Sequence, residues 1–243
     1  MVNKRVIALI PARSRSIRIK DKNIKKLNNI PLIAYTIKTA IDSKIFNRII
    51  VSTDSLKYAN LSKKFGAEIP FLRPKKISNS TNTDFEWISY TLNKLLNNHK
   101  EYDYFCILRP TSPFRTVKML KSAWRNIKKQ NNADSIRAVE LCNQHPYKMW
   151  KYKQQIIEPI FKKKINSQPS HSVQYASLPK IYVQNASLEI TKISVLKRYK
   201  NITGNKIIPF FTKNYEGFDI NTPLDWNMAK ILMQKKLVKT PFD

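Results

Sequence analysis

The chain has 243 residues, with 45 Lys plus Arg against 16 Asp plus Glu and a formal net charge of +29. This length predicts one large domain, or one domain with a small appendage. The hydrophobic fraction of 42% is enough to build a core and excludes wholesale disorder. No stretch reaches the roughly 20 uncharged apolar residues that a membrane-spanning helix needs, so we expect no membrane partner.

Two features of the sequence predict a cytoplasmic protein. The apolar run near the N-terminus has only about six residues before Arg13, which is too short for the apolar part of a signal peptide. The two cysteines, Cys106 and Cys142, have neither a CxxC partner nor a histidine at metal-binding spacing, so we expect no zinc site. Buried, reduced thiols are the expected state, with a disulfide as the alternative.

The strong positive charge has three explanations. It could be a solvated Lys-rich surface, a field that attracts small anionic substrates, or a nucleic-acid-binding surface. The basic residues are spread along the whole chain, and no helix-turn-helix, zinc-finger or RNA-binding aromatic pattern is visible, which argues against the third. With only three glycines, the chain also lacks GxGxxG and GxxxxGK[ST], the usual signatures of dinucleotide and P-loop phosphate binding.

The first part of the sequence alternates predicted strands and helices. Apolar runs predict buried strands, Pro31 is typical of a helix start and Gly66 of a helix end. In chain order we expect a strand over 5–10, a basic loop through Asn23, a helix after Pro31, a strand over 48–53, a helix over 55–65 and a short strand over 68–72. Asp54 is expected to cap the second of these helices rather than to bind a ligand.

The alternation continues to residue 139 and then weakens. We expect a helix over 84–96 with Asp84 as its cap, a strand over 104–108, a helix over 116–129 and a strand over 135–139. Residues 140–184 are polar and contain four prolines, which predicts an inserted arm. Two interpretations of this arm stay open: it forms dimer contacts, or it is a mobile surface loop. Regular elements then resume with a strand over 187–190, a helix over 194–199, a strand over 207–211 and a helix over 224–237.

This order of elements predicts an α/β fold. Strands that alternate with helices favour a doubly wound, mostly parallel sheet with right-handed crossovers. Residues 1–139 and 185–243 would form the α/β domain, and residues 140–184 the inserted arm.

Polar residues that follow the predicted strands would gather at one edge of such a sheet, where open α/β sheets bind ligands. They are Arg13, Arg15, Arg18, Lys20, Lys22, Asn23, Thr53, Asp54, Arg73 and the segments 109–115 and 217–221. Several cations, with the hydroxyls of Thr111 and Ser112 beside them, predict an anion site suited to a polyphosphate. Asp219 and Asn221 would face the same side of an extended segment and suit Mg²⁺.

Longer motifs also occur in a specific order along nearly the whole chain. They are IPAR (10–13) followed by KN (22–23), PLIAYTI (31–37), RIIVSTD (48–54), FLRP (71–74), RPTSPFR (109–115), HPYKMW (145–150), LPKIYVQNASLEI (178–190) and FDINTPLDW (218–226). In this register the sequence resembles the acylneuraminate cytidylyltransferase family, the CMP-sialic acid synthetases and their relatives that act on other nonulosonic acids.

The resemblance implies a Rossmann-like nucleotidyltransferase fold with a dimerisation arm, and a homodimer. It implies transfer of CMP from CTP to the anomeric hydroxyl of a nine-carbon 2-keto acid sugar, with release of pyrophosphate and Mg²⁺ as cofactor. Lys22 and Arg13 would be the catalytic residues. The residues implied for CTP are Ala12, Arg13, Lys22, Asn23, Arg73 and Thr83; for the sugar, Arg109, Thr111, Ser112 and Asn185; and for the metal, Asp219 and Asn221.

The chain departs from the family pattern at several positions. Residues 14–18 replace a Gly/Ser-rich stretch, with Ile17 where its Lys would stand and Arg15 or Arg18 as substitutes, and Arg109 replaces a Gln. Asn221 replaces the second metal-binding Asp, while Tyr175 and Val183 replace the arginines of the arm. Three alternatives therefore stay open: a cytidylyltransferase for 3-deoxy-octulosonate, a non-catalytic sugar-nucleotide-binding relative, and a basic nucleic-acid-binding protein.

Overall fold

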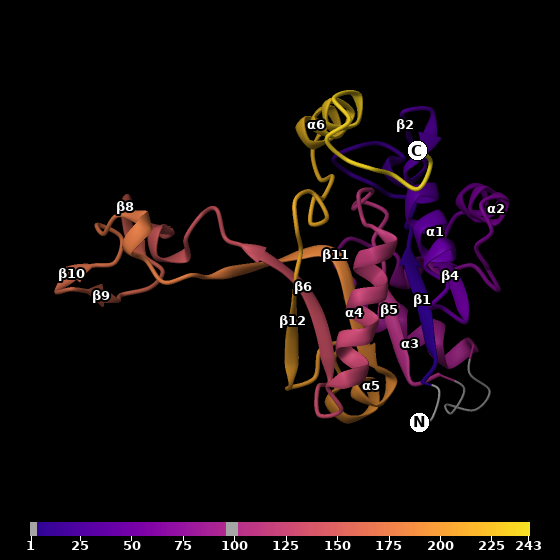
Figure 1. The fold of residues 1–243 in the computed structure, drawn as a ribbon, viewed down its shortest axis with the longest axis horizontal. Coiled ribbons are helices and arrows are strands. Elements are labelled where there is room, and N and C mark those ends of the chain that lie inside the picture. Colours follow the sequence, from indigo (N-terminus) through magenta and orange to yellow (C-terminus); the bar gives the residue numbers. More distant parts are fainter. Residues whose placement is uncertain (1–3, 96–101) are drawn as a thin grey trace. The chain divides into compact units, whose positions relative to one another are not determined.

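A six-stranded sheet forms the centre of the protein. The structure is a computed structural model and describes residues 4–95 and 102–243 (Figure 1). The strands follow the spatial order β12 (Ile207–Phe211), β6 (Ser135–Leu141), β11 (Tyr182–Lys192), β5 (Tyr104–Ile107), β1 (Val6–Pro11) and β4 (Arg48–Ser52). β1 pairs in parallel with both β4 and β5, whereas β11 pairs antiparallel with β5.

Helices cover both faces of the sheet. Successive residues of β1 point to opposite faces, so that Ala8 packs in one apolar cluster and Leu9 in another. The first cluster includes residues of α1 (Leu32–Ser43) and α4 (Val117–Lys129), and the second includes residues of α3 (Asp84–Leu95) and α5 (Ile193–Tyr199). This arrangement confirms the predicted doubly wound, mostly parallel α/β fold.

A third apolar cluster lies beside the sheet and packs the C-terminal helix against the N-terminal part of the chain. α6 (Pro223–Gln234) contributes Trp226, which packs with Ile19, Leu27 and Ile220. Leu27 belongs to the short hairpin of β2 (Lys26–Leu27) and β3 (Ile30–Pro31), which precedes α1. The cluster therefore brings two loops that are about 200 residues apart in the sequence to the same place.

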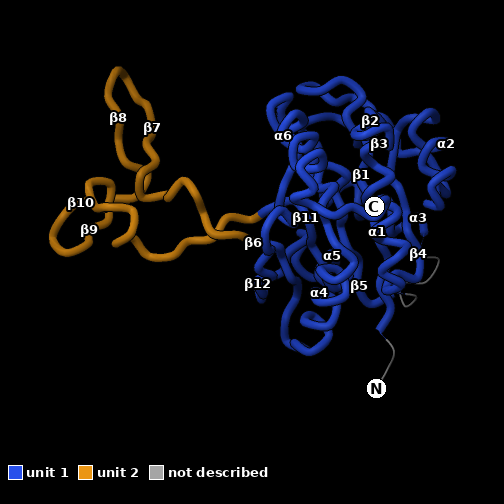
Figure 2. Tube along the Cα trace, turned by 45° about the horizontal axis from the view of Figure 1, so that its top comes forward, with its two compact units in different colours: residues 1–138, 185–243 blue, residues 139–184 orange. Residues whose placement is uncertain are grey.

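Residues 139–184 form a second compact unit, separate from the unit of residues 1–138 and 185–243 (Figure 2). This second unit contains the antiparallel hairpin of β7 (Trp150–Lys153) and β8 (Ile156–Pro159) and the short pair of β9 (Lys164–Ile165) and β10 (Gln168–Pro169). Trp150, Tyr152, Ile156 and Ile157 are all exposed on the hairpin. A role for this unit in dimerisation stays a prediction.

Most predicted helices and strands are present with small shifts at their ends. α2 (Leu56–Lys64) follows β4, α6 ends at Gln234 rather than at 237, and Leu96, which the prediction added to α3, lies outside the described residues. The predicted strand over 68–72 is wrong, because only Glu68 forms a single bridge, to Ile50. Among the described residues, no helix is long and apolar enough to cross a membrane.

Neither Asp54 nor Asp84 takes the capping role expected of it. Ser55, not Asp54, caps α2, since its side chain accepts a hydrogen bond from the Tyr58 N–H. At α3, the Asp84 carboxylate accepts hydrogen bonds from the Trp87 indole and from Arg109 instead of from the helix backbone.

The N-cap of α4 provides a test of the local stability of this fold. Thr116 Oγ1 accepts a hydrogen bond from the Met119 N–H at 3.0 Å and donates one to Glu216 at 2.9 Å. Thr116→Ala removes both, so we expect it to lower the free energy of unfolding by about 1 kcal/mol. Urea unfolding measures this change. Thr116→Ser keeps the hydroxyl and should lose less than half as much; equal losses in the two variants would contradict the capping explanation.

Candidate active site

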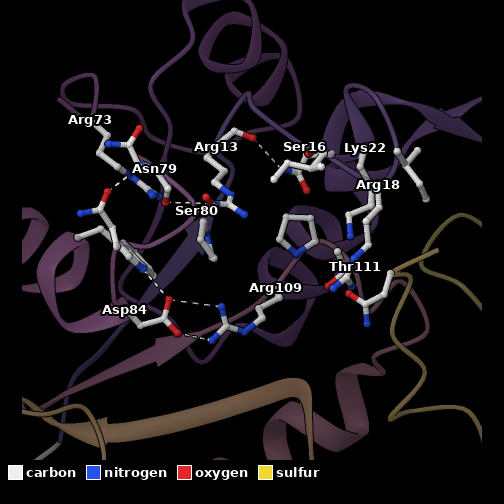
Figure 3. Close-up of a pocket in the computed structure, with 18 of the residues that line it drawn as sticks. Arg13, Ser16, Arg18, Lys22, Arg73, Asn79, Ser80, Asp84, Arg109 and Thr111 are labelled. Carbon is white, nitrogen blue, oxygen red and sulfur yellow. Dashed lines mark hydrogen bonds and ion pairs between the residues drawn. The ribbon is translucent and has the colours of Figure 1, made fainter. Parts of the chain in front are cut away.

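A cavity of about 530 Å³ opens at the carboxyl ends of β1 and β5 (Figure 3). We call it the main cavity. Its volume is typical of sites that bind small molecules. It is lined by Pro11, Arg13, Ser16, Ile17, Arg18, Ile19, Lys22, Asn23, Arg73, Ile77, Asn79, Ser80, Asn82, Asp84, Trp87, Arg109, Pro110, Thr111 and Asn221. Five of these residues are cationic and Asp84 alone is anionic, so the main cavity suits an anionic ligand.

Three cations predicted to bind CTP meet in the main cavity. Arg13, Lys22 and Arg73 come from three separate segments and all line it. Arg13 donates a hydrogen bond to the Asn79 carbonyl at 2.9 Å, which holds its guanidinium against the segment that follows Arg73. Arg18 lines the cavity as well, which makes it, and not Arg15, the candidate substitute for the Lys missing at Ile17.

Lys22 is held by the loop before α6. It lies in the short 3₁₀ helix η1 (Lys22–Ile24), and its Nζ donates to the Ile220 carbonyl at 2.7 Å. Burial lowers the pKa of Lys22, the charge of Asp219 opposes that effect, and the charge of Arg18 adds to it. The neighbouring Asn23 is buried, and its side-chain amide donates to the Arg13 carbonyl at 3.3 Å. This hydrogen bond joins the two ends of the loop between β1 and η1.

Arg73 is held in place by buried contacts. Its side chain is buried, and Nε and Nη2 donate to the side chain and carbonyl of Ser52 at 3.0 and 2.7 Å. The guanidinium lies 4.9 Å from the centroid of the Trp87 ring, within the range of a cation–π contact. Burial lowers the pKa of Arg73 to about 10, which still leaves it charged at neutral pH.

Asp54 anchors the loop that carries the first cations. Its two carboxylate oxygens accept hydrogen bonds from the backbone N–H and the hydroxyl of Ser14 at 2.8 and 2.9 Å. Further along the loop, Asp21 has the positive φ of 52° and accepts a hydrogen bond from the Tyr58 hydroxyl at 3.0 Å. Side-chain hydrogen bonds therefore fix this loop both at Ser14 and at Asp21.

The predicted metal ligands lie on the segment that holds Lys22. Asn221 lines the main cavity, whereas Asp219 does not. Asn221 Nδ2 donates to Asp219 Oδ2 at 2.6 Å, while Asp219 Oδ1 is buried and has no hydrogen-bond partner among the described residues. The backbone of this segment is fixed at both ends, because Ile220 N–H donates to the Thr111 carbonyl and Asn221 N–H to the Asp225 carboxylate.

This donor set fits a hard cation only in part. No group of three or more His, Cys, Asp or Glu that could hold a metal occurs within residues 4–95 and 102–243. The unpaired Asp219 oxygen and the Asn221 amide oxygen are nevertheless ligands that Mg²⁺ accepts, and Mg²⁺ commonly binds through one or two carboxylates plus substrate phosphates and water. These two residues thus suit an ion that arrives with a polyphosphate.

Four other predicted residues do not line the main cavity. Ala12 and Ser112 are fully buried, and the Ala12 N–H donates to the Ser52 carbonyl. Thr83 hydrogen-bonds Glu86 at the start of α3. Asn185 donates to the Thr212 hydroxyl at 2.9 Å and accepts from Ser187. Direct ligand roles for these four therefore lack support from the cavity, while a supporting role through the backbone is open to Ala12.

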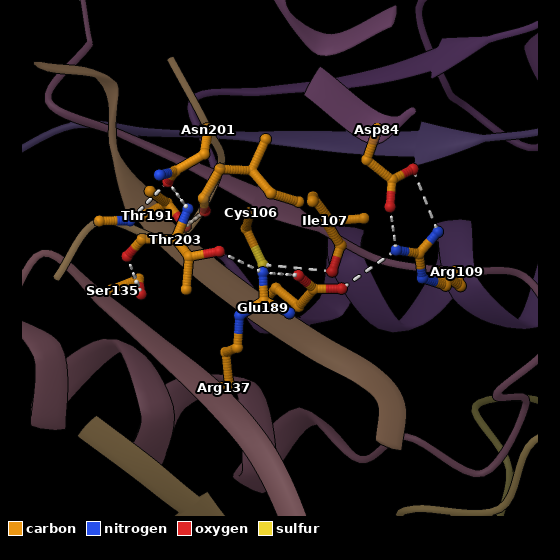
Figure 4. Close-up of polar contacts among 12 residues, drawn as sticks. Asp84, Cys106, Ile107, Arg109, Ser135, Arg137, Glu189, Thr191, Asn201 and Thr203 are labelled. Carbon is orange, nitrogen blue, oxygen red and sulfur yellow. Dashed lines mark hydrogen bonds and ion pairs between the residues drawn. The ribbon is translucent and has the colours of Figure 1, made fainter. Parts of the chain in front are cut away.

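Sequence reasoning missed the ion pairs of Arg109. Its Nη2 lies 2.6 Å from Asp84 Oδ2 and 3.1 Å from Glu189 Oε1, and Arg137 contacts the second oxygen of Glu189 at 3.0 Å (Figure 4). These four residues form a chain of alternating charges, which we call the Arg109 network. The sequence contains only one indication of this network, the position of Asp84 at the start of a predicted helix. An Asp at that position is more often a helix cap than a partner in an ion pair.

Comparison with known proteins places these features in a family. Residues 7–223 match a family described as cytidylyltransferase. A Helicobacter pylori protein named pseudaminic acid cytidylyltransferase and UDP-2,4-diacetamido-2,4,6-trideoxy-beta-L-altropyranose hydrolase is 37% identical over 144 residues, which are 59% of this chain and 28% of that protein. The chain thus spans less than a third of that relative. The CMP-N,N'-diacetyllegionaminic acid synthase of Legionella pneumophila is 28% identical and is matched over 95% of this chain and 97% of its own length.

A solved structure shows the same fold. CMP:2-keto-3-deoxy-manno-octonic acid synthetase, solved in complex with CTP, superposes with a TM-score of 0.70 at 14% identity, over 96% of this chain and all of that one. The family match over residues 7–223 includes the ends of β1 and β5 and every residue that lines the main cavity. Since this match extends over most of the sequence, the chain belongs to the cytidylyltransferase family.

Proposed function

We propose that the protein transfers CMP from CTP to a nonulosonic acid and releases pyrophosphate. The observation that carries this proposal is the convergence of Arg13, Arg18, Lys22 and Arg73 on one cavity, since a triphosphate needs such a set of cations before a nucleophile can approach it. Relatives named for pseudaminic and legionaminic acid favour a nine-carbon acid sugar as the acceptor.

The cavity residues have distinct roles in the proposed reaction. The anomeric hydroxyl oxygen of the sugar would form a bond to the α-phosphorus of CTP and release its proton to water, while the bond from that phosphorus to the pyrophosphate oxygen breaks. Arg13, Arg18 and Lys22 would neutralise the charge that develops on the phosphates. Arg73 and Asn23, which are buried and held by hydrogen bonds, would position the nucleoside. Thr111 would contact the sugar.

The metal is part of the proposal. Asp219 and Asn221 would hold Mg²⁺ together with the phosphates of CTP, because Asp219 has a buried oxygen without a hydrogen-bond partner. When bound, the ion would neutralise phosphate charge and polarise the reacting phosphoryl group. The charge of Asp219 affects the pKa of Lys22, so the two residues lie near each other and would act on the same phosphates.

Assembly and location follow as further parts of the proposal. The exposed aromatic and aliphatic side chains of the β7–β8 hairpin support a homodimer formed through residues 139–184. Cys106 and Cys142 are both buried free thiols, which supports a reducing compartment, the cytoplasm.

The alternatives are less well supported. The likeness to the octonic acid synthetase is one of fold, at 14% identity, and so gives no preference for an eight-carbon acid. Non-catalytic binding is favoured only by the changes at residues 14–18 and Asn221, yet Arg18 and Asn221 both line the cavity. For nucleic-acid binding, a steep salt dependence of affinity would be the signature.

The decisive experiment measures pyrophosphate release with CTP and a panel of acids: neuraminic, legionaminic, pseudaminic and 3-deoxy-octulosonic acid. We expect release with at least one nine-carbon acid and much less with the eight-carbon acid. Binding of CTP without release for any acid would instead support the non-catalytic relative.

Substitution of the charge-stabilising residues tests their roles. We expect Lys22→Ala and Asp219→Ala each to lower kcat by about 10²- to 10³-fold with folding intact, because each removes a group that stabilises charge in the transition state. Lys26→Ala is the matched control, since Lys26 is exposed and does not line the main cavity. Full turnover by either of the first two variants would remove that residue from the active site.

The buried position of Lys22 predicts a pH dependence of CTP binding. A phosphate ligand binds the protonated amine, and burial holds its pKa below 10.5 in the free protein. CTP affinity should therefore fall as the pH rises through this lowered pKa, at a lower pH than an exposed lysine would give. Calorimetric titration of CTP from neutral to alkaline pH measures the fall. Lys22→Arg stays charged and should flatten the curve; the same fall in both proteins would contradict this assignment.

A further inference from the structure

We propose that Asp84 determines specificity in the main cavity by accepting a hydrogen bond from a hydroxyl group of a bound ligand, and that Arg109 is the residue that positions it. This inference rests on the proposed function, in which the ligands are CTP and an acid sugar. Both ligands carry hydroxyl groups, on the ribose and on the sugar.

The Asp84 carboxylate is fixed but keeps acceptor capacity. Oδ1 accepts from the Trp87 indole at 2.7 Å and from Arg109 Nη1 at 3.4 Å, and Oδ2 accepts from Arg109 Nη2 at 2.6 Å. Two carboxylate oxygens offer about four acceptor positions, so at least one is left. The side chain is 30% exposed and lines the main cavity, so a ligand in the cavity can contact it.

Asp84 is an ionised acceptor. Burial alone would raise its pKa, but the hydrogen bonds and the charge of Arg109 and the hydrogen bond of Trp87 outweigh burial and hold the pKa below its usual value. An ionised carboxylate accepts and never donates, and its hydrogen bonds are stronger than those of neutral acceptors.

Arg109 does not serve as a receptor for an anionic group, although it lines the cavity. Its guanidinium is paired with Asp84 on one side and with Glu189, which is 2% exposed, on the other. Arg137 balances the second oxygen of Glu189 at 3.0 Å, so the Arg109 network carries two positive and two negative charges. The direct role in sugar binding that the resemblance implies for Arg109 is thereby replaced by a role in holding Asp84.

The position of Asp84 separates two parts of the ligand. Figure 3 shows Asp84 on the side of the main cavity away from Lys22 and Arg18. Phosphate and carboxylate groups would be repelled by Asp84 and attracted by these cations, so the part of a ligand next to Asp84 is neutral. The hydrogen-bond donors on the neutral parts of CTP and the sugar include the ribose and sugar hydroxyls.

The experiment uses Asp84→Asn in two arms. In the first, calorimetry compares the binding of CTP, 2′-deoxy-CTP and 3′-deoxy-CTP; in the second, the KM of the sugar is measured at saturating CTP. A hydrogen bond to a charged acceptor contributes enough to give about 10- to 100-fold discrimination. If the donor is on the ribose, the wild type should bind one deoxy analogue that much more weakly and the variant should lose the difference. If it is on the sugar, the variant should raise the sugar KM by a similar factor.

Controls separate this role from a general loss of structure or charge. Asp42→Asn is the matched variant, because Asp42 forms an ion pair with Lys38 on the surface of α1 and should change neither arm. Arg109→Lys keeps the charge of the network but loses the two-pronged contact with Asp84, so it should shift the same arm as Asp84→Asn. Affinity for pyrophosphate, which reports on the cations, should change less than threefold in either variant, and urea unfolding checks that both fold.

The outcomes distinguish the inference from the proposed function. Wild-type protein that does not bind CTP overturns both. CTP binding with unchanged discrimination and unchanged sugar KM in Asp84→Asn overturns the role of Asp84 alone. A change in pyrophosphate affinity larger than the change in either arm also overturns it, since Asp84 would then act through the overall charge of the cavity.

Discussion

A buried guanidinium holds together the edge of the sheet at which the main cavity opens. Arg115 is 2% exposed and donates to the Thr36 hydroxyl of α1, to the Arg109 carbonyl and to the Ser187 carbonyl of β11. Burial lowers its pKa to about 10, and the hydrogen bonds to these three oxygens offset part of the cost of burying its charge. The loop 109–115 is thereby fixed to α1 and to β11, and the Thr111 carbonyl in turn accepts a hydrogen bond from Ile220 N–H, next to Asp219.

This fixed edge gathers cations that form no ion pair with a carboxylate within residues 4–95 and 102–243. Arg13, Arg18, Lys22 and Arg73 line one cavity, and Arg109 is already paired within its network. Like charges held at this density repel one another, so an anionic ligand that binds there relieves the repulsion without any movement of the groups. The net charge of +29 adds a long-range field that attracts the same ligands, with a strength that falls as salt increases.

The sequence predicts the sheet and the convergence of the cations, but not the ion pairs of the Arg109 network. Arg13 and Lys22 could be placed at this edge because they follow the first strand, and parallel strands end at one edge. The prediction for Arg73 rests on a strand over 68–72 that does not form; its hydrogen bonds to Ser52, the last residue of β4, bring it to the same edge. The Arg109 network could not, because its members are 25 and 80 residues apart and no local pattern indicates that they meet. The antiparallel direction of β11 was also missed, since the chain enters it from residues 139–184 and not from a crossover helix.

The loop after β1 shows how a chain with three glycines can still build this cavity. Glycine would allow the backbone to turn freely, whereas here Asp54 holds Ser14 by two hydrogen bonds and Asp21 adopts the positive φ itself. An Asp can take that conformation because its short polar side chain forms local hydrogen bonds. Ile17, 81% exposed at the rim of the cavity, then offers no charge, and Arg18 supplies the cation from the next position. The main cavity therefore stays cationic although residue 17 carries no charge.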